Sequence, residues 1–402
     1  MGGAFGQFGG IDPVSVYDRL HGPSELSPYG QHWIATTKVN YAWTLVGYTA
    51  PWSVDHNDPN RTIAIIDTGI DTSHPEFFGD EELPSKIHPA SRSFVEGGNG
   101  FGAGFCDCIA ARYDIDDVED TLWMYNVNPH GTIVAGIAGA YAENGEGIAG
   151  VCWDCSLLVL HVSVIIPAQT ACGSPVEGCT YSARTVSDAI KYAAGWNPDD
   201  DTWGTVRARV ICTALEGAGF YLDVCDGSGL VAEAVDEAFG RGCVVVAIAG
   251  NDPDAYAGPC WSTTDPDEPN CAADQAWVPD AISSPLAFDP RTITVGGACR
   301  SGSAWHCQSK INPPIEALGS CGSALYPVRP LDNTAPVLSI VAPIEDMVVT
   351  VPDEDYAFLG EYNTGTSWAA PQVAGIVALM LKMNPALSPA EVKYILEVTA
   401  TD

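Results

Sequence analysis

The sequence predicts an α/β fold of three layers, in which a mostly parallel central sheet is covered by helices on both faces. Short apolar runs rich in β-branched residues alternate with stretches of helical period along the chain. Strands without a polar face are typical of parallel sheets buried on both sides. In addition, 46% of the 402 residues are hydrophobic, which is enough for a large core.

Each predicted element is a stretch in which the apolar residues follow one spacing, that of a helix or of a buried strand, and Gly, Pro or polar residues bound it. In chain order, the elements are a strand at 62–67, a helix at 130–140, a strand at 156–162, a helix at 185–195, a strand at 208–215, a helix at 230–242, strands at 243–251 and 292–298, and a helix starting at Ser367. In such a fold, functional residues gather at the carboxyl ends of the strands.

The last predicted helix has almost no polar face. Small residues such as Ala374 and Gly375 follow its start, and Val377 and Leu379 continue an apolar surface, so we expect burial on all sides. Ser367 is predicted as its N-cap, with Pro371 in the first turn. A buried helix start offers free N–H donors to an anion.

The sequence predicts one main domain with insertions in its loops. Residues 1–27 are rich in Gly, Pro and Ser and are predicted to be an extension or linker, and residues 28–402 the domain itself, with its C-terminal end expected to be cut short. The predicted insertions share many Pro, Gly, Asp and Cys residues and cover 97–129, 166–182, 196–206, 252–284 and 299–336.

The charge excludes several classes of partner. Seventeen basic against 51 acidic residues give a formal net charge of −34, which repels nucleic acids and anionic lipid surfaces. No apolar stretch approaches the roughly 18 residues of a membrane span. We therefore expect no nucleic-acid binding and no membrane insertion.

Fourteen cysteines predict an oxidising compartment and up to seven disulfides, so secretion is expected, with the export signal absent from this chain. Plausible local bridges are Cys172–Cys179, Cys260–Cys271 and Cys299–Cys307. Cys152 and Cys155, followed by His161, instead suggest zinc, but no second pair completes a set of four ligands.

Three polar residues stand at element ends among glycines and small residues. Asp67 ends a strand before Thr-Gly, His130 opens the second motif, HGTIVAGIAGA, and Ser367 lies in GTSWAAPQVAG. Singly, each reads as a turn or capping residue. Together they form the order Asp, His, Ser, which matches the order of a subtilisin-type catalytic triad.

These motifs resemble those of the subtilisin (subtilase) family of serine endopeptidases, and the resemblance runs from about residue 29 to 402. It implies that Asp67 orients His130, that His130 takes the proton of the Ser367 hydroxyl, and that Ser367 attacks the peptide carbonyl to form an acyl-enzyme. By the same resemblance, Asn251 and the Ser367 backbone N–H form the oxyanion hole. No cofactor is implied for catalysis.

The resemblance also implies a substrate-binding edge. The segment VICTALEGAG suggests that Leu215, Glu216 and Gly217 lie beside the cleft, with Gly250 next to the oxyanion position, and that a protein or peptide substrate pairs with them as an extended strand. Glu216 replaces the family's common glycine. It predicts some preference for basic or polar substrate residues, unless it points into solvent.

Two further expectations follow from the family. Structural Ca²⁺ is expected at Glu76, Glu143 and Asn144, and an acidic cluster at 114–120 is as compatible with a solvated surface as with a second site. An inhibitory propeptide is expected before processing.

Two alternatives to an active endopeptidase remain open here, namely an inactive binding protein of the same fold and a peptide ligase or cyclase.

Overall fold

The structure, a computed structural model, describes residues 30–48, 53–78, 83–94, 130–162, 183–215, 230–250, 285–301, 304–306, 338–352, 355–359 and 365–400. The predicted extension at 1–27 lies outside these residues, as do the predicted insertions at 97–129, 166–182 and 252–284 and most of 299–336. The division of the chain at residue 28 therefore stays a prediction.

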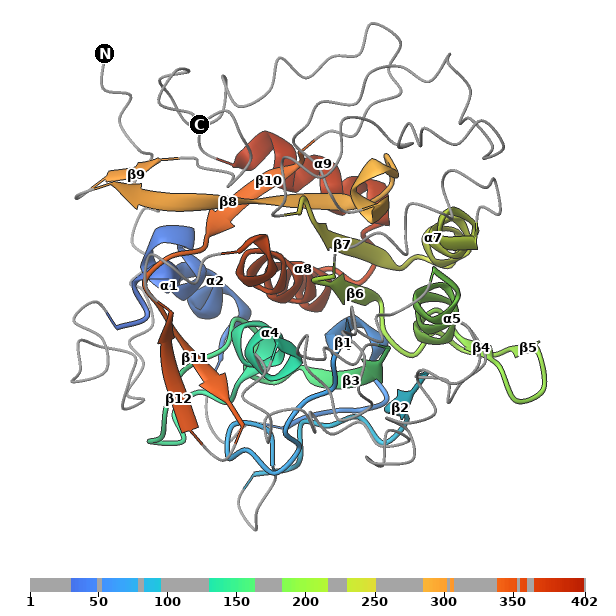
Figure 1. The fold of residues 1–402 in the computed structure, drawn as a ribbon, viewed down its shortest axis with the longest axis horizontal. Coiled ribbons are helices and arrows are strands. Elements are labelled where there is room, and N and C mark those ends of the chain that lie inside the picture. Colours follow the sequence, from blue (N-terminus) through green and yellow to red (C-terminus); the bar gives the residue numbers. More distant parts are fainter. Residues whose placement is uncertain are drawn as a thin grey trace, which may run out of the picture.

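An eight-stranded sheet forms the centre of the described part (Figure 1). Its order is β10-β8-β7-β6-β1-β3-β2, all in parallel, with β9 antiparallel to β8. The strands are β1 (Thr62–Asp67), β2 (Arg92–Ser93), β3 (Ser156–His161), β6 (Val210–Thr213), β7 (Val244–Ile248), β8 (Ile293–Ser301), β9 (Ala304–His306) and β10 (Ile340–Pro343). The predicted parallel sheet is confirmed.

Helices cover both faces of this sheet, as predicted. On β1, Ile63 and Ile65 face the cluster that contains α4 and α8, whereas Ala64 and Ile66 face the cluster of α5 and α7. Figure 1 shows these two layers on opposite sides of the strands. The helices are α1 (His32–Thr37), α2 (Val39–Val46), α4 (His130–Gly139), α5 (Ala183–Ala193), α7 (Leu230–Gly240), α8 (Ala370–Met383) and α9 (Pro389–Thr399).

The start of α8 differs from the prediction. Ser367 does not cap this helix, because it lies in the preceding 3₁₀ turn η5 (Thr366–Trp368), and the N-cap is Ala369, without a side-chain bond. Most of α8 is buried, as expected, while Met383 in the last turn is exposed. The chain therefore delivers Ser367 on a tight turn rather than on the helix itself.

Several elements were not predicted. The predicted insertion at 196–206 contains a short hairpin of β4 (Trp196–Asn197) and β5 (Thr202–Trp203). A second hairpin joins β11 (Met347–Val351) and β12 (Asp355–Leu359) beside α4. Short 3₁₀ turns η1 (Pro59–Arg61) and η3 (Pro285–Phe288) precede β1 and β8.

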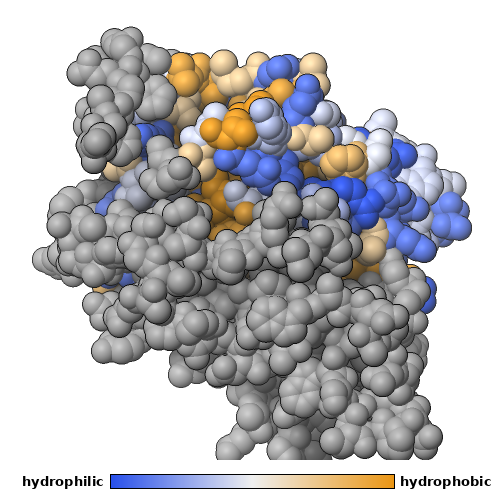
Figure 2. All heavy atoms as spheres, turned by 90° about the horizontal axis from the view of Figure 1, so that it is seen from above, coloured by the Kyte–Doolittle hydropathy of each residue, from blue (hydrophilic) through white to orange (hydrophobic). Residues whose placement is uncertain are grey.

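Polar and apolar side chains mix on the surface of the described residues seen from above in Figure 2. The large apolar side chains that are exposed in the described part include Met383, Tyr394 and Val398 near the C-terminal end. None of the described helices is both long and apolar enough to cross a bilayer.

Candidate active site

The candidate site lies where the strand order changes direction. The chain leaves β1 to build β2 and β3 on one side and β6, β7, β8 and β10 on the other. Ligands of open α/β sheets bind at the carboxyl ends of the strands at such a point. Asp67 is the last residue of β1, and Ala214 directly follows β6. The Ser367 hydroxyl donates to the Ala214 carbonyl oxygen over 3.2 Å, which joins η5 to this edge.

Asp67 and His130 are paired, as predicted. His130 Nδ1 lies 2.7 Å from Asp67 Oδ1, and Asp67 is 1% exposed. The backbone N–H of Thr68 donates to the same oxygen over 2.8 Å. A carboxylate only accepts, so Nδ1 carries the proton, which leaves Nε2 of the neutral ring as an acceptor. This is the tautomer that a general base needs.

Glycine brings the start of α4 against the turn after Asp67. A Cβ atom at Gly131 would lie 1.9 Å from the Gly69 carbonyl oxygen, so no larger residue fits there. The Gly131 N–H donates to Thr68 Oγ1 over 3.0 Å. Gly69 itself has a φ of 92°, a value that favours glycine. The small residues of the second motif therefore set the distance between His130 and Asp67.

Ser367 is held in the turn η5, between the end of β7 and the start of α4. The Gly250 N–H donates to Thr366 Oγ1 over 3.3 Å, and the Trp368 ring lies 5.2 Å from the His130 ring. Ser367 is 6% exposed. The elements that carry Asp67, His130 and Ser367 therefore meet at one edge of the sheet.

The other predicted site residues are only partly described. Leu215 is buried after β6, and Gly250, with a φ of 110°, follows β7 at the same edge. Asn251, Glu216 and Gly217 lie outside the described residues, so their roles stay predictions.

Sequence reasoning missed the contact of Trp368 with His130 and the bond of Thr366 to Gly250. The Trp within GTSWAAP was the available signal for the first of these.

The described residues around Glu76 do not fit the predicted calcium ion. Glu76 is fully buried, and its carboxylate accepts hydrogen bonds from Ile148 N (2.8 Å), Tyr356 Oη (3.1 Å) and Asn144 Nδ2 (3.1 Å). All three groups direct hydrogens rather than oxygen lone pairs at the carboxylate, whereas Ca²⁺ needs oxygen ligands. Glu143 is exposed, with a φ of 62°. The acidic cluster at 114–120 lies outside the described residues.

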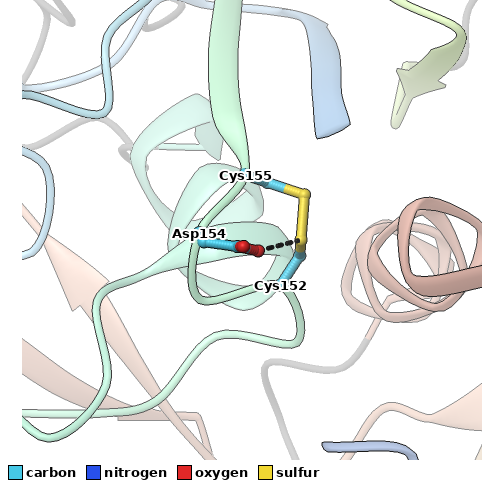
Figure 3. A group of neighbouring side chains, drawn as sticks. All are labelled: Cys152, Asp154 and Cys155. Carbon is cyan, nitrogen blue, oxygen red and sulfur yellow. Dashed lines mark hydrogen bonds between the residues drawn. A yellow bond between two sulfur atoms is a disulfide. The ribbon is translucent and has the colours of Figure 1, made fainter. Parts of the chain in front are cut away.

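Cys152 and Cys155 form a disulfide in the turn between α4 and β3 (Figure 3). Their sulfurs lie beside Asp154, but a disulfide provides no thiolate for zinc. His161, the third candidate ligand, instead approaches Ser93 with Nδ1.

The count of possible bridges is also smaller than predicted. Cys212 and Cys243 are buried free thiols, and removing them from the 14 cysteines leaves 12, or six bridges at most. The pairs predicted for Cys172, Cys260 and Cys299 involve side chains outside the described part.

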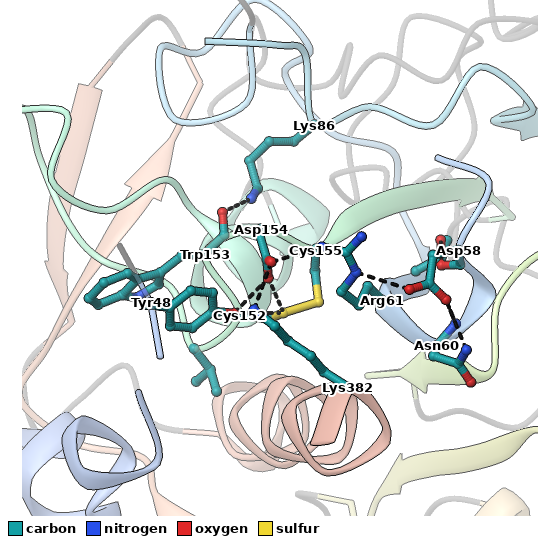
Figure 4. Close-up of a disulfide and its surroundings, with 12 residues drawn as sticks. Tyr48, Asp58, Asn60, Arg61, Lys86, Cys152, Trp153, Asp154, Cys155 and Lys382 are labelled. Atoms are coloured by element: carbon teal, nitrogen blue, oxygen red, sulfur yellow. Dashed lines mark hydrogen bonds and ion pairs between the residues drawn. A yellow bond between two sulfur atoms is a disulfide. The ribbon is translucent and has the colours of Figure 1, made fainter. Parts of the chain in front are cut away.

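Asp154 in this turn binds residues at the ends of β1 and α8 that lie opposite the candidate site (Figure 4). Its carboxylate accepts from Arg61 before β1 (2.9 Å), Lys382 in α8 (2.8 Å) and Tyr48 after α2 (2.7 Å). Burial raises the pKa of Asp154, but its bonds to Lys382, Tyr48 and Arg61 outweigh burial and leave the pKa lowered. The carboxylate therefore stays charged at neutral pH.

Comparison with known proteins agrees with this geometry. The "Extracellular protease" of Xanthomonas campestris pv. campestris is 26% identical over 84% of this chain and 47% of its own length. Subtilisin E of Bacillus subtilis (strain 168) is 28% identical over 90% of this chain and 66% of its own length. The chain thus spans about half to two thirds of the length of these two relatives.

A protease of Pseudoalteromonas arctica has the same fold. Its structure aligns with a TM-score of 0.52 and 19% identity, over 87% of this chain and 88% of its own. The sequence also matches the model of the Subtilase family over residues 58–402, which is most of the chain. With the strand order, the Asp67–His130 pair and the Ser367 turn at one edge, this match shows that the chain belongs to the subtilase family.

Proposed function

We propose that the chain is a serine endopeptidase that hydrolyses peptide bonds with Asp67, His130 and Ser367. The observation that carries the proposal is the 2.7 Å bond between His130 Nδ1 and the buried Asp67 carboxylate, at the edge that also receives the Ser367 turn. The relatives named above are described as proteases or subtilisins, which favours hydrolysis over a binding protein or a ligase.

In the first step, the Ser367 hydroxyl turns from the Ala214 carbonyl oxygen toward Nε2 of His130. The Oγ proton moves to Nε2, the Oγ–C bond forms, and the carbonyl π electrons move to the oxygen. Collapse of this tetrahedral species breaks the C–N bond, and the leaving amine takes the proton from Nε2. Water then repeats the sequence on the acyl-enzyme. Asp67 holds the Nδ1 proton and stabilises the imidazolium.

The negative charge on the carbonyl oxygen needs donors at the same edge. Asn251 directly follows Gly250, whose N–H is bonded to Thr366 beside Ser367. This adjacency supports the proposed oxyanion hole of the Asn251 amide and the Ser367 N–H. Removing one donor of this kind costs roughly 10²–10³ in kcat.

We also propose secretion, processing from an inhibitory propeptide and action on protein substrates. Fourteen cysteines and the relative named an extracellular protease support secretion. A relative of 26% identity is named the major intracellular serine protease of Bacillus subtilis (strain 168), so the family name alone does not decide location.

The catalytic assignment is tested by casein hydrolysis together with labelling by a phosphonylating reagent. We expect one labelled residue, Ser367, and a loss of roughly a millionfold in kcat for Ser367→Ala. Ser388→Ala is the control, because Ser388 only caps α9 and should leave both signals intact. Labelling elsewhere, or casein hydrolysis by Ser367→Ala, contradicts the proposal. A cyclic product from a model peptide would favour a ligase.

Substrate preference is a separate prediction. If Glu216 lines the cleft, its carboxylate favours basic side chains, and kcat/KM should be higher for an Arg-bearing than for a Phe-bearing peptide. Glu216→Gly should reduce this ratio about tenfold, the effect of one charge pair of ~1.4 kcal/mol. An unchanged ratio means that Glu216 points into solvent.

A further inference from the structure

We propose that Trp368 is a positioning residue for His130: its indole ring holds the imidazole plane for proton transfer and stabilises the imidazolium. This inference rests on the proposed peptidase function. It concerns a side chain that follows the nucleophile in sequence and contacts the base in space, so that one turn of the chain controls both groups.

The contact between the two rings is direct. Their centroids lie 5.2 Å apart, with an angle of 40° between the planes. Trp368 is 3% exposed, and the His130 side chain is 13% exposed. The bond from Nδ1 to Asp67 holds one edge of the imidazole, but limited rotation about the His130 side-chain torsions can still move Nε2 on the opposite edge. An indole packed against the ring limits this rotation and therefore fixes the direction of Nε2.

Trp368 is itself held firmly. Its backbone N–H donates to the Gly365 carbonyl oxygen over 3.1 Å, and its backbone carbonyl oxygen accepts from Gln372 Nε2 over 2.8 Å. Gln372 is fully buried and also donates to the Pro343 carbonyl oxygen over 2.7 Å, which connects η5 to β10. Because the backbone of Trp368 is anchored in this way and its side chain is buried, the indole can act as a rigid support for the imidazole.

The electrostatic effect follows from the charges near His130. The elements packed against α4 are β1, β3, β11, α8 and η5. Their titratable groups are Asp67, which is bonded to His130, His161 at the end of β3, the Ser367 hydroxyl, and Lys382 at the far end of α8. β11 carries none. The π face of an indole attracts a nearby cation, so Trp368 adds to Asp67 in favouring the imidazolium.

The inference is tested by replacing the indole with side chains that do and do not carry a π face. Trp368→Leu and Trp368→Met remove it, whereas Trp368→Phe keeps an aromatic ring. We expect kcat to fall about three- to thirtyfold in the Leu and Met variants, with KM nearly unchanged. The Phe variant should show about half of that decrease in log kcat.

A second readout does not depend on turnover. NMR titration of ¹³C-labelled histidine in a Ser367→Ala background follows the His130 pKa directly. Without the indole, the cation is less favoured, so the His130 pKa should fall by about 0.5–1.5 units in Trp368→Leu and less in Trp368→Phe. The acid limb of the kcat profile of the active variants should move in the same direction.

Trp33→Leu is the matched control, because Trp33 is fully buried in α1, which packs against α2 and β10 and carries none of the candidate site residues. It should lower the melting temperature like Trp368→Leu but leave kcat and the His130 pKa unchanged. The inference is overturned if folded Trp368 variants keep the parent kcat and His130 pKa, or if Trp33→Leu shifts them equally. If the parent neither cleaves casein nor labels at Ser367, the peptidase proposal fails instead, while the titration still tests the ring contact.

Discussion

At the scale of single residues, Lys86 stands out as a lysine with no exposed surface. Its ammonium donates to the Trp153 carbonyl oxygen over 2.6 Å and lies 4.6 Å from the centre of the Tyr141 ring. Burial lowers the pKa of Lys86 from 10.5 to about 7, although the charges of Asp154 and Glu76 act in the opposite direction. The folded protein therefore holds this proton less tightly than the unfolded chain does.

This difference predicts how stability depends on pH. Between pH 7 and 10.5 the unfolded chain binds more protons at Lys86 than the folded protein, so the free energy of unfolding should rise with pH across that window. Below pH 7 Lys86 is charged in both states, so the full free-energy cost of burying its charge lowers the stability of the folded protein there. Lys86→Met should remove this contribution, which urea unfolding at pH 7, 8 and 9 can measure. Identical pH slopes in the parent and the variant would contradict the prediction.

Gly131 predicts a steric effect on catalysis. An added Cβ would clash with the Gly69 carbonyl oxygen at 1.9 Å, so Gly131→Ala must push the start of α4 away from Asp67. A displacement of about 1 Å in a catalytic group can cost about 100-fold in kcat. The control is Gly240→Ala in α7, where a Cβ meets nothing within 4 Å. This control should keep its activity and melting temperature. Equal activities of the two variants would exclude the steric argument.

Sequence motifs predicted the Asp67–His130 pair because each residue stands at an element end beside glycines that permit close approach. They could not predict the partners of Glu76, because Tyr356 is distant in sequence and only folding brings its hydroxyl to the carboxylate. Acidic residues in a loop therefore suggested calcium, while hydrogen-bond donors occupy that position in the structure.

At the scale of elements, β1, α4 and α8 are joined at both ends. At one end they carry Asp67, His130 and the turn before α8. At the other end, Asp154 forms ion pairs with Arg61 and Lys382, and the Cys152–Cys155 disulfide closes the same turn (Figure 4). Lys382 also lies 4.0 Å from the centre of the Tyr48 ring. The cluster fixes the far ends of the elements that present the candidate triad.

Asp154→Ala should therefore be strongly destabilising. It leaves the partly buried cations of Arg61 and Lys382 without their shared carboxylate, a change that costs about 3–5 kcal/mol in buried pairs. Asp199→Ala is the control, because Asp199 pairs with Arg92 at an exposed site, where such pairs contribute under about 1 kcal/mol. Urea unfolding of both variants measures the difference. Similar losses would mean that the cluster does not hold these elements together.

The strands β1, β3, β6, β7 and β8 were predictable from their apolar runs, and the helices α4, α5, α7 and α8 from their small residues or helical period, whereas β2, β10, α1, α2 and α9 were not predicted. The hairpin β11–β12 was not predicted either, since its apolar strand MVVTV follows an insertion without a periodic signal. The turn η5 was also missed. Serine is a favoured N-cap, so local propensity placed Ser367 at the helix start, whereas the structure has one additional 3₁₀ turn there.

At the scale of the whole molecule, the formal net charge of −34 dominates the electrostatics. Like charges distributed over one folded chain repel one another, and unfolding relieves this repulsion by separating them. Ion pairs such as Lys382–Asp154 lie partly buried and are screened less than surface charges. Added salt should therefore weaken the repulsion more than it weakens the attractions that hold the core.

The melting temperature should consequently rise with NaCl between about 0.01 and 0.5 M, since the Debye length falls from about 30 Å to a few ångströms over that range. CaCl₂ and MgCl₂ at matched ionic strength separate this general effect from specific binding. Because Glu76 is surrounded by donors, Glu76→Gln should not change the response to calcium. If CaCl₂ raises the melting temperature more than MgCl₂ does, and Glu76→Gln removes this extra rise, the result would support the calcium site predicted at Glu76. A melting temperature that falls with NaCl would mean that attractive surface pairs outweigh the net charge.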